Sequence, residues 1–256
     1  MSAQQKYNDF LIFLEDKGLI KRTPGFIHSY EKKYPYFKEL EKNQHIIKEE
    51  CQTLLKHAGQ LHDVEGMAGN KTRGGISSAI QWKQFMFKAG TFVEENCALC
   101  PETAKMLKRV PRIKQAFFSI LYPNQYITPH RGYFYGFLRY HLGVIVPYDN
   151  KDEKCWIRIN DNISDNNNNY NKHSIEKGDK YYWKEGKGIM FNDNYVHDAS
   201  NESDQIRVVL WLDVVRKFPF WINWLNSLAL FIAYKNKTVQ KVAKDAVVHD
   251  LAIDKS

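Results

Sequence analysis

Cysteine is scarce in this sequence, which contains four in 256 residues: Cys51, Cys97, Cys100 and Cys155. A disulfide-stapled secreted domain has a much higher density of cysteine, so we expect free thiols and a reducing compartment, the cytoplasm. Cys97 and Cys100 have the CxxC spacing of half a zinc site, but no second CxxC or histidine pair follows at a suitable distance. The sequence therefore excludes a disulfide scaffold, and we interpret the cysteines as incidental to function.

Long hydrophobic runs are missing as well. The apolar burst at 10–14 is followed at once by Glu15 and Asp16, so it is too short and too acidic for the core of a secretion signal. Residues 220–234 are strongly apolar, but this stretch is shorter than the roughly 20 residues that span a bilayer. Because Asn223, Asn226 and Ser227 share one face, we predict an amphipathic helix. Three alternatives remain for its apolar side. It packs on the protein or a dimer partner, it lies on the cytoplasmic surface of an anionic membrane, or it spans a bilayer, for which the stretch is short.

The composition gives no sign of disorder or of a fibrous protein, because 43% of the residues are hydrophobic, 14% aromatic and 26% charged. The formal net charge of +8 favours anionic partners such as phosphates, anionic lipids or acidic substrates. No RNA-recognition, zinc-finger or basic-helix pattern accompanies this charge, so we predict no nucleic-acid partner. The sequence carries no signal for the oligomeric state.

The spacing of apolar residues changes along the chain. Residues 1–60 and a short segment from Pro101 have helical spacing. Seven later segments have the two-residue period of strands, at 117–122, 125–130, 137–147, 155–160, 180–183, 189–192 and 207–215. We therefore predict a mainly β protein with flanking helices, whose core is a sandwich or a barrel. A double-sheet jelly roll of the cupin-like kind, with a cavity between its two sheets, is one standard way to close such a set of strands.

We divide the chain into three parts of a single domain. An N-terminal helical layer is expected at 1–112, the β core at 113–217, and a C-terminal amphipathic helix with a charged tail at 218–256. Glycines at 69–75 indicate a loop, and the Asn-rich insertion at 161–172 indicates a long exposed hairpin loop.

Two of the predicted strands carry arginines among apolar residues. In the segment 137–146, side-chain alternation places Arg139 and His141 on the same face, opposite the apolar residues. In the segment 207–213, Arg207 shares a face with Val209 and Trp211. A buried guanidinium without a partner is costly, so we expect an anion beside Arg207, either an aspartate of the protein or a ligand.

Two histidines lie at strand ends, His130 closing the segment 125–130 and His197 within 194–198, ten residues before Arg207. Two histidines at a cavity mouth, with an arginine deeper in the cavity, form an arrangement that can hold non-haem iron with open coordination sites. A packed or solvated role for each histidine is the simpler alternative that spacing alone leaves open.

Several spaced blocks resemble the aspartyl/asparaginyl β-hydroxylase family. They are TPHRG (128–132), LRYHLG (138–143), WKEG (183–186), FND (191–193), His197, Asn201 and RVVLWLD (207–213). The resemblance extends over residues 83–217. It implies a double-stranded β-helix oxygenase that uses Fe(II), with 2-oxoglutarate and dioxygen as co-substrates.

The resemblance also implies roles for individual residues. His130 and His197 match the two iron-ligating histidines, and Arg207 and Ser119 match the residues that hold the far carboxylate of 2-oxoglutarate. His141 matches a histidine that contacts the co-substrate. Arg139 matches an arginine expected near the substrate's carboxylate, and Gly132 stands where most 2-oxoglutarate oxygenases have an Asp or Glu ligand. His130, His197 and Arg207 are thus the expected catalytic residues.

The substrate stays open at this stage. The family resemblance implies the Asp or Asn side chain of a peptide or protein, but Phe137 replaces a substrate-side arginine of the animal enzyme and Asn192 replaces a common Asp. The sister group of lipid A acyl-chain hydroxylases shares the LRYHLG block, although its members have Asp at the position of Gly132 and an N-terminal membrane anchor. A lipid is therefore the alternative substrate, and a non-catalytic cupin-like ligand-binding module is the alternative from another class.

Overall fold

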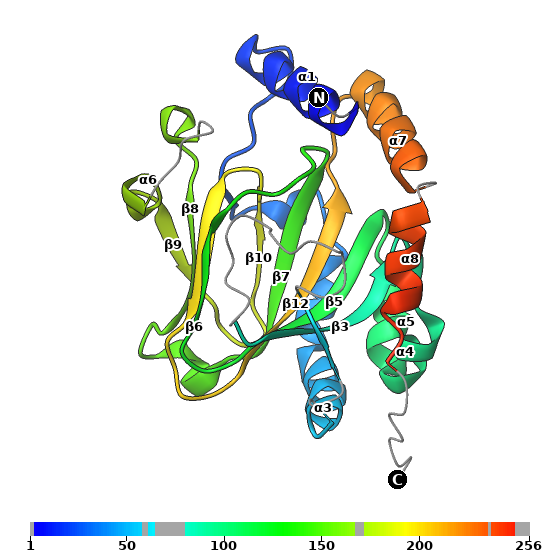
Figure 1. The fold of residues 1–256 in the computed structure, drawn as a ribbon, viewed down its shortest axis with the longest axis vertical. Helices are drawn as coiled ribbons and strands as arrows, with labels where there is room; N and C mark the ends of the chain where they lie inside the picture. The colour runs from blue at the N-terminus through cyan, green and yellow to red at the C-terminus, as the bar shows by residue number, and fades with distance from the viewer. Residues whose placement is uncertain (1–2, 58–60, 65–79, 167–171, 235–236, 249–256) are drawn as a thin grey trace.

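Two antiparallel β-sheets facing each other form the centre of the protein (Figure 1). The computed structural model describes residues 3–57, 61–64, 80–166, 172–234 and 237–248. The larger sheet has the order β1-β10-β7-β12-β5-β3-β2, with β4 paired to β3. Its strands are β1 (Phe26–Ile27), β10 (Gly188–Phe191), β7 (Phe137–Ile145), β12 (Arg207–Val215), β5 (Ile113–Leu121), β3 (Trp82–Ala89), β2 (His62–Asp63) and β4 (Thr91–Phe92).

The smaller sheet has the order β6-β11-β8-β9, with β6 (Gln125–His130), β11 (Val196–Asn201), β8 (Cys155–Asn160) and β9 (Asp179–Tyr182). Every described pair of neighbouring strands in the two sheets is antiparallel. This sandwich confirms the predicted jelly-roll fold with flanking helices, and each of the seven predicted strand segments overlaps an observed strand.

Helices cover the outer face of the larger sheet and one end of the sandwich (Figure 1). The described α-helices are α1 (Ala3–Asp16), α2 (Phe37–Lys42), α3 (Gln44–Leu55), α4 (Glu94–Leu99), α5 (Pro101–Arg109), α6 (Lys172–Glu176), α7 (Phe220–Tyr234) and α8 (Lys237–Asp245), of which α6 lies against β8 and β11 of the smaller sheet. The side chains of β7 that alternate away from Arg139 pack into the core beneath α2, α3 and α5. Phe37 of α2 stacks on Tyr140 of β7 with ring centroids 3.9 Å apart.

The N-terminal layer expected at 1–112 is not helical throughout. Strand β3 lies inside it and pairs with β5 over almost its whole length. Phe85, Met86 and Phe87 are all buried, so this strand is covered on both faces and lacks the alternation by which a half-exposed strand is recognised. Strand β11 is missing from the seven segments that periodicity predicts, because its sequence VHDASN is polar although all six residues are buried.

The Asn-rich insertion lies where the sequence predicts it. Strands β8 and β9 pair with each other, so residues 161–172 belong to the connection of a hairpin. Residues 167–171 of this connection, and the loop expected at 69–75, lie outside the described residues.

The helix expected at 220–234 is present, but of the three polar residues that share a face, Asn226 is buried, Asn223 is half-buried and Ser227 is exposed. Asn226 is fully buried, and its Nδ2 donates to the carbonyl oxygen of Gly136 at 3.2 Å. Ile222 and Leu230 are buried beside it, whereas Trp224 is 67% exposed. The polar residue faces inward because it satisfies backbone groups of the protein, and the apolar face is left outside. None of the described helices has the length and hydrophobicity to span a bilayer.

Candidate active site

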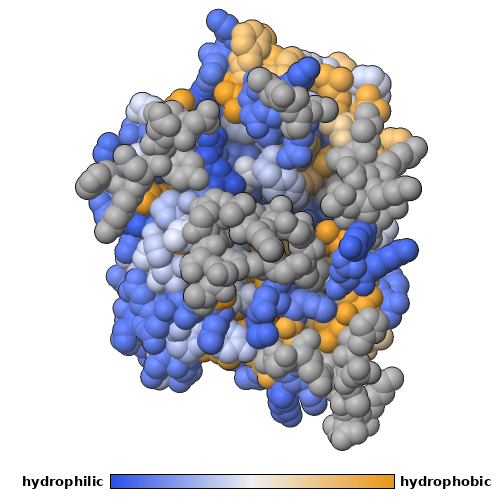
Figure 2. Space-filling view, viewed as in Figure 1, coloured by the Kyte–Doolittle hydropathy of each residue, from blue (hydrophilic) through white to orange (hydrophobic). Residues whose placement is uncertain are grey.

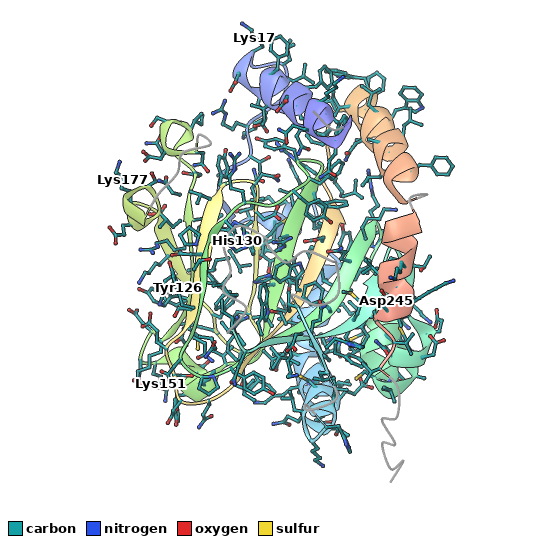
Figure 3. The ribbon with its side chains drawn as sticks, in the orientation of Figure 1. Lys17, Tyr126, His130, Lys151, Lys177 and Asp245 are labelled. Atoms are coloured by element: carbon teal, nitrogen blue, oxygen red, sulfur yellow. The ribbon has the colours of Figure 1, made fainter. Side chains whose placement is uncertain are left out.

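A small pocket opens between the two sheets. The six residues singled out in the sequence all line it: Ser119, His130, Arg139, His141, His197 and Arg207. The remaining walls are Trp82, Ile127, Ile157, Trp183, Phe191, Ala199 and Trp211. Figure 3 labels His130 in the middle of the molecule, on β6. Residues from widely separated parts of the chain therefore converge on one largely apolar cavity.

His130 and His197 lie side by side on the smaller sheet. Their Cα atoms are partners in the pairing of β6 with β11, and their ring centroids are 4.1 Å apart. Each Nδ1 is hydrogen-bonded to a backbone carbonyl oxygen two residues earlier, that of Thr128 at 2.8 Å and that of Tyr195 at 2.9 Å. A carbonyl only accepts, so Nδ1 carries a proton in both rings, and Nε2 is the nitrogen that carries the lone pair when the ring is neutral. Burial favours the neutral ring at His197 by lowering its pKa well below the usual range. Oriented neutral imidazoles of this kind are suited to holding a metal ion.

A third protein ligand does not come from position 132. Among the described residues, no group of three or more His, Cys, Asp or Glu side chains is arranged to hold a metal ion. A Cβ atom at Gly132 would lie 2.2 Å from Oδ2 of Asp193, and the Gly132 amide donates to the Asp193 carbonyl oxygen at 2.6 Å. The carboxylate of Asp193 thus occupies the space of a side chain at position 132. These residues fit an iron site with two protein ligands.

We expect the variant Gly132→Asp to lose stability without gaining affinity for iron. Its side chain collides with Asp193, which is held by Arg139, and overpacking of this kind costs about 1–3 kcal/mol. Urea unfolding and Fe(II) titration measure the two quantities, and Gly132→Ala separates bulk from charge. Tighter Fe(II) binding by Gly132→Asp would show that the position can supply a ligand after all.

Arg139 faces the pocket, as the alternation predicts, but its charge is already neutralised. Its Nε lies 2.8 Å from Oδ1 of Asp213, and its NH2 lies 2.8 Å from Oδ2 of Asp193. The guanidinium also stacks on Trp211 at 3.8 Å from the ring centroid. Asp193 and Asp213 were not singled out in the sequence, although Asp213 pairs with Arg139 across β12 and β7 and is the anion that a buried arginine demands. The substrate contact implied for Arg139 stays a prediction.

Arg207 differs sharply from Arg139. It is 1% exposed, and no described carboxylate forms an ion pair with it. Its guanidinium lies over Trp183 at 4.6 Å from the ring centroid, and its Nε has no hydrogen-bond partner among the described residues. Burial lowers the pKa of Arg207 to about 10. A buried cation in this state is a site for an anionic ligand.

Further polar groups of the pocket lack partners within the described part of the chain. They are both ring nitrogens of His141 and Nε1 of Trp183. Burial, with the nearby charges of Arg139 and Arg207, lowers the pKa of His141 well below its usual range, so this imidazole is neutral. Ser119 lies opposite Val209 in the pairing of β5 with β12, and its Oγ accepts from Nε1 of Trp82 at 2.8 Å. The pocket thus combines a histidine pair with a cationic, hydrogen-bonding end.

We expect the stability of the metal-free protein to fall as the pH drops below about 6.5, the pKa of histidine in an unfolded chain. Burial lowers the native pKa values of His141 and His197 well below that value. The unfolded chain therefore binds protons that the native protein does not. As the pH falls, the free energy of unfolding decreases by up to about 1.4 kcal/mol per pH unit for each histidine. Urea unfolding at about pH 7.5 and about pH 5.5 measures this slope.

The variant His141→Gln removes one of the two histidines that bind a proton only on unfolding. The change of the unfolding free energy with pH should therefore become smaller by the contribution of His141. His45 on α3 is exposed, so His45→Gln is the matched control that leaves the slope unchanged. A slope that is the same in His141→Gln as in the parent chain would contradict the neutral state of this imidazole.

Comparison with known proteins gives consistent matches. A family model described as aspartyl/asparaginyl beta-hydroxylase matches residues 41–169 and 168–217. An ornithine lipid ester-linked acyl 2-hydroxylase of Rhizobium tropici is 33% identical over 207 residues, which are 78% of this chain and 66% of that protein. The human aspartyl/asparaginyl beta-hydroxylase is 26% identical over 69% of this chain but only 20% of its own length. The chain thus spans about two thirds of the first relative and a fifth of the second.

Solved structures overlap less closely. A Pseudomonas putida prolyl-4-hydroxylase has 11% identity and a TM-score of 0.40, and the overlap covers 76% of this chain and 94% of that chain. A cupin domain from Bordetella pertussis has 10% identity and a TM-score of 0.28, over 41% and 83% of the two chains. The assignment of the fold rests on the strand order of the protein itself.

Proposed function

Because this chain belongs to the aspartyl/asparaginyl β-hydroxylase family, we propose that it is a hydroxylase that uses Fe(II), 2-oxoglutarate and dioxygen to oxidise an unactivated C–H bond. In the balanced reaction, the substrate gains one oxygen atom as a hydroxyl group, while 2-oxoglutarate takes the other and leaves as succinate and carbon dioxide. The observation that carries the proposal is the pocket that contains both the histidine pair and a buried arginine without a described ion-pair partner.

The two ends of the pocket have different tasks in this proposal. His130 and His197 would hold the iron through Nε2, because each Nδ1 is hydrogen-bonded to a backbone carbonyl. When bound, the iron would supply the oxygen chemistry. Arg207 and Ser119 would hold the far carboxylate of 2-oxoglutarate, whose charge offsets the burial cost of the guanidinium. The aromatic walls of the pocket would keep water out of the space between the two ends.

For the substrate, we favour the acyl chain of a lipid. The relative that is named as a lipid hydroxylase is 33% identical, against 26% for the human relative named for Asp and Asn. An acidic peptide would need a cation near the iron, but Arg139 is already neutralised by Asp193 and Asp213. The Asp or Asn side chain of a peptide is the second candidate, and the description of the family model supports it.

Two measurements test the proposal in sequence. Anaerobic addition of Fe(II) and then 2-oxoglutarate should produce the visible metal-to-ligand charge-transfer band of a chelated keto acid. Under oxygen, ornithine lipid in detergent micelles should stimulate succinate release and gain one oxygen atom on its ester-linked acyl chain, detected by mass spectrometry.

The outcomes separate the alternatives. Succinate release with an Asp-containing peptide, but not with the lipid, would retain the oxygenase and replace its substrate class. Absence of the band in a folded protein that binds Fe(II) would overturn the oxygenase and favour a cupin-like binding module.

A further inference from the structure

An exposed aromatic surface covers the end of the molecule where α1 and α7 lie together (Figure 1). We call it the α1–α7 face, and it consists of Phe10, Phe13, Phe220, Trp221, Trp224, Leu228 and Phe231. Phe220 is 86% exposed and Trp224 is 67% exposed. Figure 2 shows hydrophobic residues gathered at the same end of the molecule. Contiguous apolar surfaces of this kind mark sites of contact with a partner or a membrane.

The α1–α7 face is held firmly by buried polar contacts beneath it. Glu15 of α1 forms a buried ion pair with Arg216, directly after β12, and accepts a hydrogen bond from the hydroxyl of Tyr135. Asn226 of α7 accepts from the hydroxyl of Tyr7 at 3.1 Å. Rotating α7 to bury its aromatic side would expose these paired groups, so the apolar residues stay outside.

The charges around this face favour an anionic partner. The exposed residues Lys6, Phe10 and Phe13 of α1, and Lys17 directly after it, follow one another at spacings of three and four residues, so a lysine stands at each end of the apolar stripe. Helix α7 has no charged residue within its sequence, FWINWLNSLALFIAY. Asp9 is an exposed acidic residue of α1, and Asp16 is paired with Arg22.

The face is also connected to the pocket. Residues 131–136 join β6, which ends at His130, to β7, which carries Arg139. This link is bound from both helices. Nδ2 of Asn8 donates to the Tyr133 carbonyl oxygen at 2.9 Å, and Asn226 donates to that of Gly136. The α1–α7 face therefore stands at the end of the pocket that carries His130 and Arg139.

We propose that the α1–α7 face binds the surface of an anionic lipid bilayer, with both helices lying in the plane of the interface. Exposed tryptophan and phenylalanine side chains insert at the headgroup level, and lysines beside them pair with anionic headgroups. If the proposed lipid substrate holds, this orientation brings the end of the pocket with His130 and Arg139 close to the bilayer from which an acyl chain is drawn. The binding itself does not depend on catalysis.

Vesicle flotation of the full chain tests this proposal. We expect the parent chain to float with vesicles of phosphatidylcholine and phosphatidylglycerol, and more weakly with phosphatidylcholine alone. The double variant Trp224→Ser and Phe231→Ser should have an affinity for the vesicles that is lower by roughly tenfold or more. Two large apolar side chains that move from water into the bilayer in the parent chain are missing from this variant. Lys6→Glu with Lys17→Glu should lose the preference for anionic vesicles.

Ile163 provides the matched control, since it is 53% exposed and lies outside the α1–α7 face. Ile163→Ser should float like the parent chain, and every variant should retain the charge-transfer band with Fe(II) and 2-oxoglutarate.

No flotation of the parent chain, or equal flotation of the Trp224 and Phe231 variant, would overturn the proposal. A parent chain that stays off vesicles and elutes as a dimer, which the double variant dissociates, would instead assign the face to a second copy. Because the band reports on the pocket and flotation on the face, failure of one is distinguishable from failure of the other.

Discussion

Replacing either His130 or His197 with alanine is expected to abolish turnover and the charge-transfer band. The described residues offer two imidazoles and no third clustered ligand, so each histidine supplies half of the protein's donor set. A metal site with more ligands tolerates the loss of one better than this site does. A titration with Fe(II), monitored by tryptophan fluorescence, measures the loss of metal binding directly. Circular dichroism checks that each variant is folded.

His141→Gln is the matched comparison for these two variants. It removes an imidazole from the same pocket, but one whose ring is packed among Trp183, Phe191 and Trp211. We expect it to retain Fe(II) binding and to weaken the affinity for 2-oxoglutarate. If His130→Ala kept the band, or if His141→Gln lost Fe(II) as completely as the other two variants, the assignment of the metal ligands would be wrong.

Replacing Arg207 with methionine is expected to raise the stability of the metal-free protein and to lower its affinity for 2-oxoglutarate. Burial lowers the pKa of Arg207 to about 10 from an ordinary value near 12.5, so the charged form costs on the order of 3 kcal/mol in the folded chain. Methionine fills similar space without that cost. The same change removes charge-assisted hydrogen bonds to the co-substrate. The loss of one such bond costs roughly 1.5–3 kcal/mol, which corresponds to a rise of at least roughly 10- to 150-fold in KM.

The opposite signs of these two effects make the test specific. Urea unfolding without ligands measures the first, and the dependence of succinate release on 2-oxoglutarate measures the second, with Fe(II) affinity expected to stay unchanged. Arg207→Lys keeps the charge but loses the planar fork, so it should recover only part of the affinity. An unchanged KM in Arg207→Met would remove Arg207 from the carboxylate site, and a loss of stability would mean that the guanidinium is paired within the protein.

The location of the candidate site could be predicted from local patterns. Alternation along 137–146 placed Arg139 and His141 opposite the apolar residues, and alternation along 207–213 placed Arg207 on the face of Val209 and Trp211. All three polar residues line the pocket. Their roles in iron and 2-oxoglutarate binding came from the family resemblance and stay predictions. The state of each arginine could not be predicted in this way. Whether a guanidinium meets an aspartate depends on which strand lies beside it, and Arg139 meets Asp213 only because β7 and β12 are neighbours in that register.

The sequence by itself determined the fold class, seven strands of the sandwich and the helix at 220–234, because these follow from the spacing of apolar residues along a few turns or pleats. Only the tertiary structure decided the burial of β3 and β11, the filling of the space beside Gly132 by Asp193, and the outward side of α7. These features depend on contacts between distant segments. Asn226 faces inward because it forms hydrogen bonds with the carbonyl of Gly136 and the hydroxyl of Tyr7. The aromatic side of α7 is exposed as a result.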